Sequence, residues 1–232
     1  MSISRLVVLT WLLCTLCKAQ DTQFLPEVDT HLTLNNMVRL LIQAKDDREG
    51  GDPTQFTFGP SVQLYFTPLL KLKSVTTFDL DNVKKRMVVL ESGYRIIAAP
   101  GNPVENRAIE SVTFHLPIFE QILLSDRNRA DLDWQAGSFT WRYRNKLVAE
   151  RTVPLYSYHL IPYIAAEPFY ESKYGKWSTT DLYAGCRFPI GTLVQLDAYY
   201  EHENNTGKSP NKQNNFFGIN LNLYFSRKGV TH

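Results

Sequence analysis

Ionisable side chains recur at every second position in several stretches of this sequence. One stretch carries Arg127, Arg129, Asp131 and Asp133, and others carry Glu91, Arg95, Arg142, Arg144, Asp181, Arg187, Asp197 and Glu201. Side chains two residues apart lie on the same face of a β-strand, so each stretch predicts a charged strand face. Carboxylates and guanidinium groups on one surface can form ion pairs, because the planar arginine fork binds a carboxylate at two points. The same groups can also line a polar passage, and the sequence leaves both roles open.

Motifs for covalent or metal-dependent chemistry are missing from the sequence. The G-x-S-x-G nucleophile elbow is absent, and so is the His-x-Ser-Asn-Gly pattern of lipid-hydrolysing barrels, because His159 is followed by Leu160 and Ile161. Glu201, His202 and Glu203 are adjacent, but alternation along a strand would direct His202 away from both carboxylates. No CxxC, HExxH or phosphate-binding loop occurs from Gln20 onward, since the one CxxC, Cys14 to Cys17, lies within the first nineteen residues. We therefore expect no enzyme activity, no metal site and no cofactor.

The charged stretches belong to segments with strict two-residue alternation, the pattern of strands that are apolar on one face. In the clearest case, Phe217 to Phe225 places an apolar residue at every odd position, with Gly218, Asn220 and Asn222 between them. Such runs, separated by turn residues, predict about twelve strands. These strands are 27–35, 37–46, 55–66, 69–78, 85–97, 105–116, 121–135, 138–150, 155–166, 177–189, 192–203 and 213–225.

Several of these strands exceed the ~5–6 residues typical of soluble sheets and match the ~9–11 residues with which a tilted strand crosses a bilayer. If the apolar face contacts lipid, the charged face lines the interior. This sorting avoids the ~2–4 kcal/mol that Arg or Lys costs on the lipid face at mid-bilayer. We therefore predict an all-β fold: a single antiparallel transmembrane β-barrel of about 12 strands, within a range of 10 to 14.

The alternation also predicts where individual side chains point. On one strand, Leu182, Ala184, Cys186 and Phe188 would face lipid. Inside the barrel, Arg142 and Arg144 would pair with Asp131, Asp133 or Asp181 and close the lumen or nearly close it.

Connection lengths predict an orientation, because outer-membrane barrels have short periplasmic turns and longer outer loops. With the C-terminus in the periplasm, Asn204 to Lys212 and Glu167 to Lys176 would be outer loops, and Pro189 to Gly191 an inner turn. The polar segment Asp46 to Thr54 is the exception, since it would form a long loop on the periplasmic side.

The first residues predict export. Arg5 precedes a twelve-residue apolar run from Leu6 to Cys17, which is too short to span a bilayer. We expect a signal peptide at 1–19, with cleavage after Ala19, and a barrel domain at 20–232. Loss of Arg5 and Lys18 leaves 23 basic residues against 23 acidic ones, so there is no cationic excess to bind nucleic acid.

The last strand resembles the C-terminal signal by which outer-membrane barrels are recognised for assembly. Its residues are Gly218, Leu221, Leu223 and Phe225, although Ser226 to His232 follow where the aromatic residue normally ends the chain. This resemblance implies that the barrel-assembly machinery is a partner.

Seven segments resemble the bacterial family called domain of unknown function 2490. They are Ser125 to Arg129, Phe139 to Asn145, Glu150 to Thr152, Tyr158 to Tyr163, Trp177 to Ser178, Tyr183 to Cys186 and Tyr200 to Pro210. The resemblance covers nearly the whole mature region and implies an outer-membrane β-barrel, with no established activity to carry over.

Three functional hypotheses follow. The first is a barrel in the outer membrane of a Gram-negative-type bacterium, in contact with outer-membrane lipid, that acts as a narrow porin-like channel or a structural surface protein. The second is an exported soluble barrel that binds a small apolar ligand and turns its apolar face inward. The third, a lipid-modifying barrel enzyme, lacks the grouped Ser, His and carboxylate or amide that it would need. The sequence does not predict the oligomeric state.

Overall fold

The computed structural model describes residues 22–49, 52–66, 82–118, 122–156, 158–207 and 209–227, and nearly all of them are in strands. The elements are β1 (Thr22–Thr33), β2 (Val38–Glu49), β3 (Asp52–Phe66), the 3-10 helix η1 (Asn82–Lys85), β4 (Val88–Ala98), β5 (Glu105–Ile118), β6 (Ile122–Gln135), β7 (Ser138–Arg151), β8 (Val153–Leu155), β9 (Tyr158–Glu171), β10 (Lys176–Ile190), β11 (Val194–Asn205) and β12 (Lys212–Ser226). The predicted signal peptide and the predicted strand at 69–78 lie outside these ranges.

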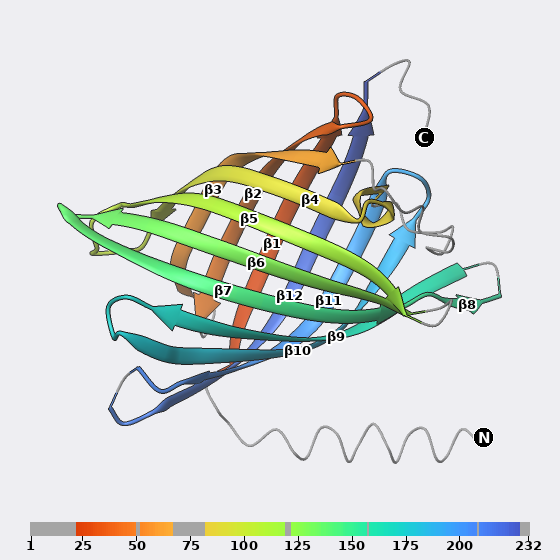
Figure 1. Ribbon diagram of the computed structural model, residues 1–232. Helices are drawn as coiled ribbons and strands as arrows, with labels where there is room; N and C mark the ends of the chain where they lie inside the picture. The colour runs from red at the N-terminus through yellow and green to blue at the C-terminus, as the bar shows by residue number, and fades with distance from the viewer. Residues whose placement is uncertain are drawn as a thin grey trace, which may run out of the picture.

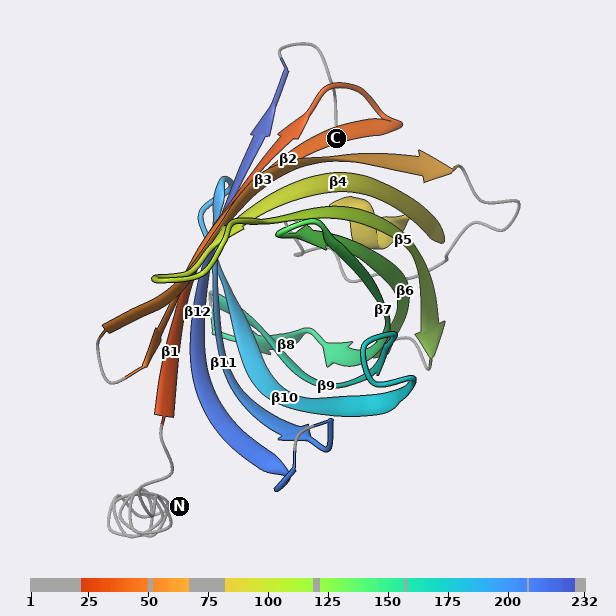
Figure 2. The same cartoon turned by 90° about the vertical axis from the view of Figure 1, so that its left-hand side faces the viewer.

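Eleven strands form a closed barrel, and the short strand β8 pairs only with β9 beside it. Figure 1 shows the barrel from the side, and Figure 2 looks into its ring of strands. The prediction of an all-β barrel of about twelve strands is confirmed. Within the described ranges, no helix is long and apolar enough to cross a membrane.

The barrel closes through a parallel seam between β1 and β12, where Thr22 is level with Asn215 and Thr33 with Ser226. Every other neighbouring pair is antiparallel, so the expectation of a wholly antiparallel barrel is wrong at this one seam. An odd number of alternating strands makes the first and the last run in the same direction. Consequently β1 begins at one end of the barrel and β12 ends at the other (Figure 1).

The predicted periplasmic loop from Asp46 to Thr54 is also wrong. Strand β2 continues to Glu49 and β3 begins at Asp52, and these two residues are paired, so the described part of the segment belongs to two paired strands. Thr54 Oγ1 donates to the carbonyl of Asp47 at 2.9 Å. The polar residues that suggested a loop are instead accommodated in paired strands.

The connections between strands are not short at one end of the barrel and long at the other, as predicted. The predicted outer loop at Glu167 to Lys176 is shorter than expected, because β9 continues to Glu171. The predicted outer loop at Asn204 to Lys212 corresponds to the connection between β11 and β12. Phe66 and Val88, the strand ends that flank the longest connection, are paired at the opposite end of the barrel, where β12 also ends. Loop length therefore gives no orientation for this barrel.

Alternation places apolar side chains outside and polar ones inside. On β3, Phe56, Phe58 and Leu64 are exposed, whereas Thr57 and Gln63 are buried between them. The buried residues of the molecule include many charged or polar side chains, such as Arg95, Asp131, Glu167 and Gln195. This distribution is the reverse of a soluble protein, where burial favours apolar groups.

Candidate functional site

The barrel interior contains a cavity of about 690 Å³, to which every barrel strand contributes side chains. Its lining is dominated by charged and amide groups. The inward apolar face that a soluble barrel for an apolar ligand would need is not found among the described residues.

All ten residues of the predicted charge network are on inward-facing positions. Arg127, Arg129, Arg142, Arg144, Asp181, Arg187, Asp197 and Glu201 line the cavity, and Asp131 and Asp133 are buried in its wall. Glu91 and Arg95 line the same space. The parity of the strands therefore brings these groups together, although they come from five strands, β4, β6, β7, β10 and β11.

Asp131 is the first centre of ion pairing, and its side chain is fully buried. Arg129 Nε lies 2.5 Å from it, and Arg142 and Arg144 each lie 3.6 Å away. Arg142 also contacts Asp133 at 3.5 Å. Two of the expected acidic partners of the arginines are thus present.

Glu167 is the second centre, in place of the expected partner Asp181. Its fully buried carboxylate accepts from Arg144 Nη2 at 2.8 Å, Arg127 Nη2 at 3.1 Å and Lys146 Nζ at 3.2 Å. Sequence analysis missed Glu167 because its segment was interpreted as a loop. The signal was present, since Tyr163 and Glu167 share the parity of one strand face.

A third cluster lies toward the end of the barrel where β12 finishes. Lys84 of η1 reaches Glu150 at 2.7 Å, Glu150 contacts Arg187 at 2.5 Å, and Arg187 contacts Asp197 at 3.2 Å. Figure 2 shows η1 within the outline of the strands. The link between β3 and β4 thereby inserts a buried cation into this end of the interior.

The interior also contains a hydrogen-bonded serine and histidine that sequence analysis missed. Ser125 Oγ lies 2.8 Å from His115 Nδ1, and both residues are buried on neighbouring strands β5 and β6. Among the residues that the structure describes, no group of three or more His, Cys, Asp or Glu side chains could hold a metal ion.

The outer surface is not apolar everywhere. Glu110 and Ser92 hydrogen-bond at 2.7 Å on exposed positions of β5 and β4. On the adjacent strands, Asn145 donates to Asp126 at 2.7 Å and to Asn128 at 3.1 Å. These residues form a polar stripe across β4, β5, β6 and β7.

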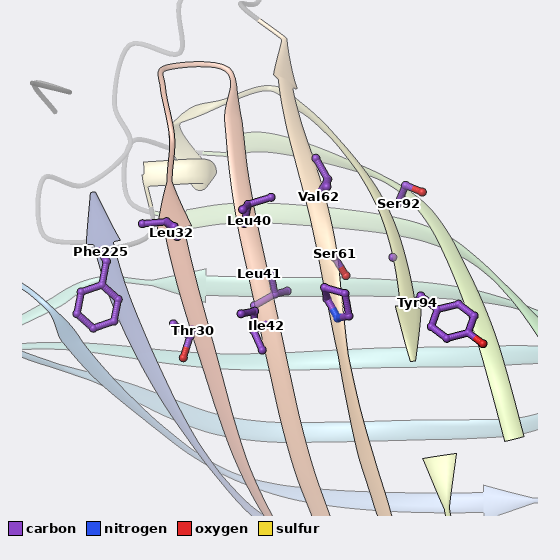
Figure 3. A pocket seen from close by; sticks show the side chains of 12 residues that line it. Thr30, Leu32, Leu40, Leu41, Ile42, Ser61, Val62, Ser92, Tyr94 and Phe225 are labelled. Carbon is purple, nitrogen blue, oxygen red and sulfur yellow. The ribbon is translucent and has the colours of Figure 1, made fainter. Parts of the chain in front are cut away.

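Beside this stripe the outer face is aliphatic and slightly hollowed. A groove of about 550 Å³ runs over β12, β1, β2, β3 and β4, and Figure 3 shows Leu32, Leu40, Ile42, Val62 and Phe225 along it.

The residues of the expected assembly signal divide between the two faces. Leu221, Leu223 and Phe225 are on outward positions of β12, and Gly218 is on an inward one. A Cβ at Gly218 would come within 2.0 Å of the Tyr199 ring, so packing alone accounts for the glycine.

In comparisons with known proteins, no protein-family model and no curated protein sequence matches this chain. The resemblance to domain of unknown function 2490 therefore stays a prediction.

Proposed function

We propose that this protein is an outer-membrane β-barrel whose polar interior serves as a narrow channel. The observation that carries the proposal is the inverted distribution of side chains, with an aliphatic and aromatic exterior around a charged cavity. A lipid environment stabilises such an exterior, whereas water would disfavour it.

Several expectations from the sequence belong to this proposal. Residues 1–19 would direct export, the barrel-assembly machinery would recognise β12, and the outer groove along Leu40 and Val62 would accommodate acyl chains of outer-membrane lipid. The chain would be a member of the resembled family and would carry no catalytic activity.

The charged interior supports passage of small polar solutes. In its ion pairs, several cations share few carboxylates. The side chain of Arg127 is about one third exposed within the cavity, and that of Arg142 about one quarter. A structural barrel with no passage is the competing outcome.

Membrane fractionation and planar-bilayer conductance test the proposal together. We expect the exported full chain to require detergent for extraction and the refolded barrel to give discrete single-channel currents. Recovery in the soluble periplasmic fraction would contradict the membrane location. Detergent dependence without any current would leave a structural barrel, and lipid hydrolysis by the same sample would identify an enzyme.

A further inference from the structure

At one level of the barrel interior, paired residues on neighbouring strands from β6 to β11 form a row that is cationic at one end and anionic at the other. Arg127 of β6 is level with Lys146 of β7, Glu167 of β9 with Asp181 of β10, and Asp181 with Glu203 of β11. The Lys146–Glu167 ion pair of 3.2 Å joins the two halves. Cations therefore occupy β6 and β7, and carboxylates occupy β10 and β11.

At the cationic end of the row, cations outnumber the carboxylate that they contact. Glu167 alone is shared by Arg127, Arg144 and Lys146. Arg127 is the most exposed of these cations, and its Nε has no hydrogen-bond acceptor among the described residues. About a third of this side chain is exposed and lines the cavity, where it is accessible to an anionic group.

The anionic side lacks contacting cations. Asp181 and Glu203 are directly opposite each other on the neighbouring strands β10 and β11, and like charges in this arrangement destabilise a sheet. Asp181 is only 4% exposed and lines the cavity, yet its Oδ1 has no hydrogen-bond partner in the described part of the chain. Its neighbours Glu201 and Glu203 have no ion pair there within 4.0 Å, and Glu203 accepts only from the neutral Asn214.

A buried carboxylate with an unsatisfied oxygen costs free energy unless a cation or donor approaches it. A bound ammonium group would supply three N–H donors at this place. Three strand spacings of ~4.8 Å separate β6 from β10, so the backbones at Arg127 and Asp181 lie roughly 14 Å apart along the wall. The Arg127 side chain shortens that gap, because it already reaches Glu167 on β9 at 3.1 Å.

We propose that the cavity binds small zwitterionic solutes, with the ammonium group at Asp181 and Glu203 and the anionic group at Arg127. This inference deepens the proposed function by naming a solute class, and it rests on the interior being accessible to solutes.

The test uses three probes of one chain length: 5-aminopentanoate, pentanoate and pentylammonium. Each is titrated calorimetrically into the refolded full chain in detergent micelles, with empty micelles as the blank. We expect 5-aminopentanoate to bind at least tenfold more tightly than either singly charged probe. Asp181→Asn and Arg127→Gln should each weaken that binding about tenfold, whereas Glu110→Gln, on the outer surface, should leave it unchanged.

Circular dichroism establishes that each variant is folded, and Glu203→Gln replaces Asp181→Asn if the latter does not refold. Equal binding of all three probes, or binding of pentylammonium or Mg²⁺ as tight as that of the zwitterion, would overturn the inference. Bilayer conductance separates the two proposals. Current without zwitterion preference refutes only the binding site, and zwitterion preference without current refutes only the channel.

Discussion

The ring of Tyr199 on β11 lies directly over Gly218 on β12, in register and inside the barrel. A Cβ built at Gly218 would approach ring carbon Cζ to 2.0 Å, closer than any real contact. The absence of a side chain at Gly218 therefore leaves the space that the Tyr199 ring occupies. Gly185 and Tyr163 repeat the arrangement on β10 and β9, with an approach of 2.6 Å.

Gly218→Ala should destabilise the barrel by about 1–3 kcal/mol, because added volume in a packed site displaces its neighbours. The measurement is thermal unfolding of the refolded protein in detergent. Tyr199→Ala should restore most of the loss when combined with Gly218→Ala, since it removes the ring. A double variant as unstable or as poorly assembled as Gly218→Ala would favour a role for the glycine in assembly.

Glu167→Gln should cost more stability than Arg142→Ala. The first change leaves Arg127, Arg144 and Lys146 without their shared carboxylate, at up to ~3–5 kcal/mol for full burial, and water in the cavity reduces this. Among the described residues, Arg142 forms two ion pairs, at 3.5 and 3.6 Å, so its loss should cost less. Loss of heat-modifiable gel mobility on heating provides the measurement.

The exposed pair of Asp46 and Arg48 supplies a control, because such pairs contribute about 0–1 kcal/mol. Asp46→Asn should therefore behave like the wild type. If Arg142→Ala keeps wild-type stability but changes ion selectivity, the arginine lines a working pore and contributes little to the fold.

Lys84→Ala should increase single-channel conductance. Lys84 of η1 forms an ion pair with Glu150, and its removal takes a buried cation away from that end of the interior. The neighbouring exposed residue gives a matched variant, Lys85→Ala, which should conduct as the wild type does. Equal conductance in all three proteins would show that η1 does not restrict the passage.

Much of the fold could be predicted from two-residue alternation alone. Phe217 to Phe225 and Leu182 to Ile190 are strands with the expected faces, because each apolar or polar choice is local to one strand. The segment Asp46 to Thr54 could not be assigned in this way. Its Gly, Pro and charged residues are typical of loops, and only pairing between β2 and β3 distinguishes a hairpin.

The site was harder to predict, because strand parity gives a face but not a level along the barrel. It placed Arg144 and Asp181 on the interior, yet Arg144 pairs with the unexpected Glu167 as well as with the expected Asp131. Those choices depend on cross-strand register, which the chain does not encode locally. The parallel seam likewise depends on the total strand count.

Cys186 should report the environment of the outer surface. It is half-buried on the outward side of β10, on the same face as the exposed Leu182. In membranes it should react with a small lipid-soluble maleimide and resist a charged one. Gln43→Cys, on a Cys186→Ser background, gives the interior control and should accept the charged reagent, since Gln43 lines the cavity. Equal rapid labelling of Cys186 by both reagents would place it in water.

Glu110→Leu, within the polar stripe, gives the sharpest test of whether lipid or water covers the outer surface. Glu110 is exposed on β5 and accepts a hydrogen bond from Ser92 Oγ. If lipid covers this surface, an apolar residue should stabilise the barrel in vesicles by on the order of 1 kcal/mol, since acidic groups cost less than the ~2–4 kcal/mol of Arg or Lys there.

In water the same change should alter stability by no more than about 0.5 kcal/mol. Ser92→Ala serves as the control, because it removes the hydrogen bond without adding apolar area and should give no gain. Thermal unfolding in vesicles and in detergent measures both variants. A loss of stability on Glu110→Leu, together with a smaller assembly in native electrophoresis, would mean that the stripe contacts a protein neighbour instead of lipid, because polar groups join membrane-embedded surfaces by hydrogen bonds.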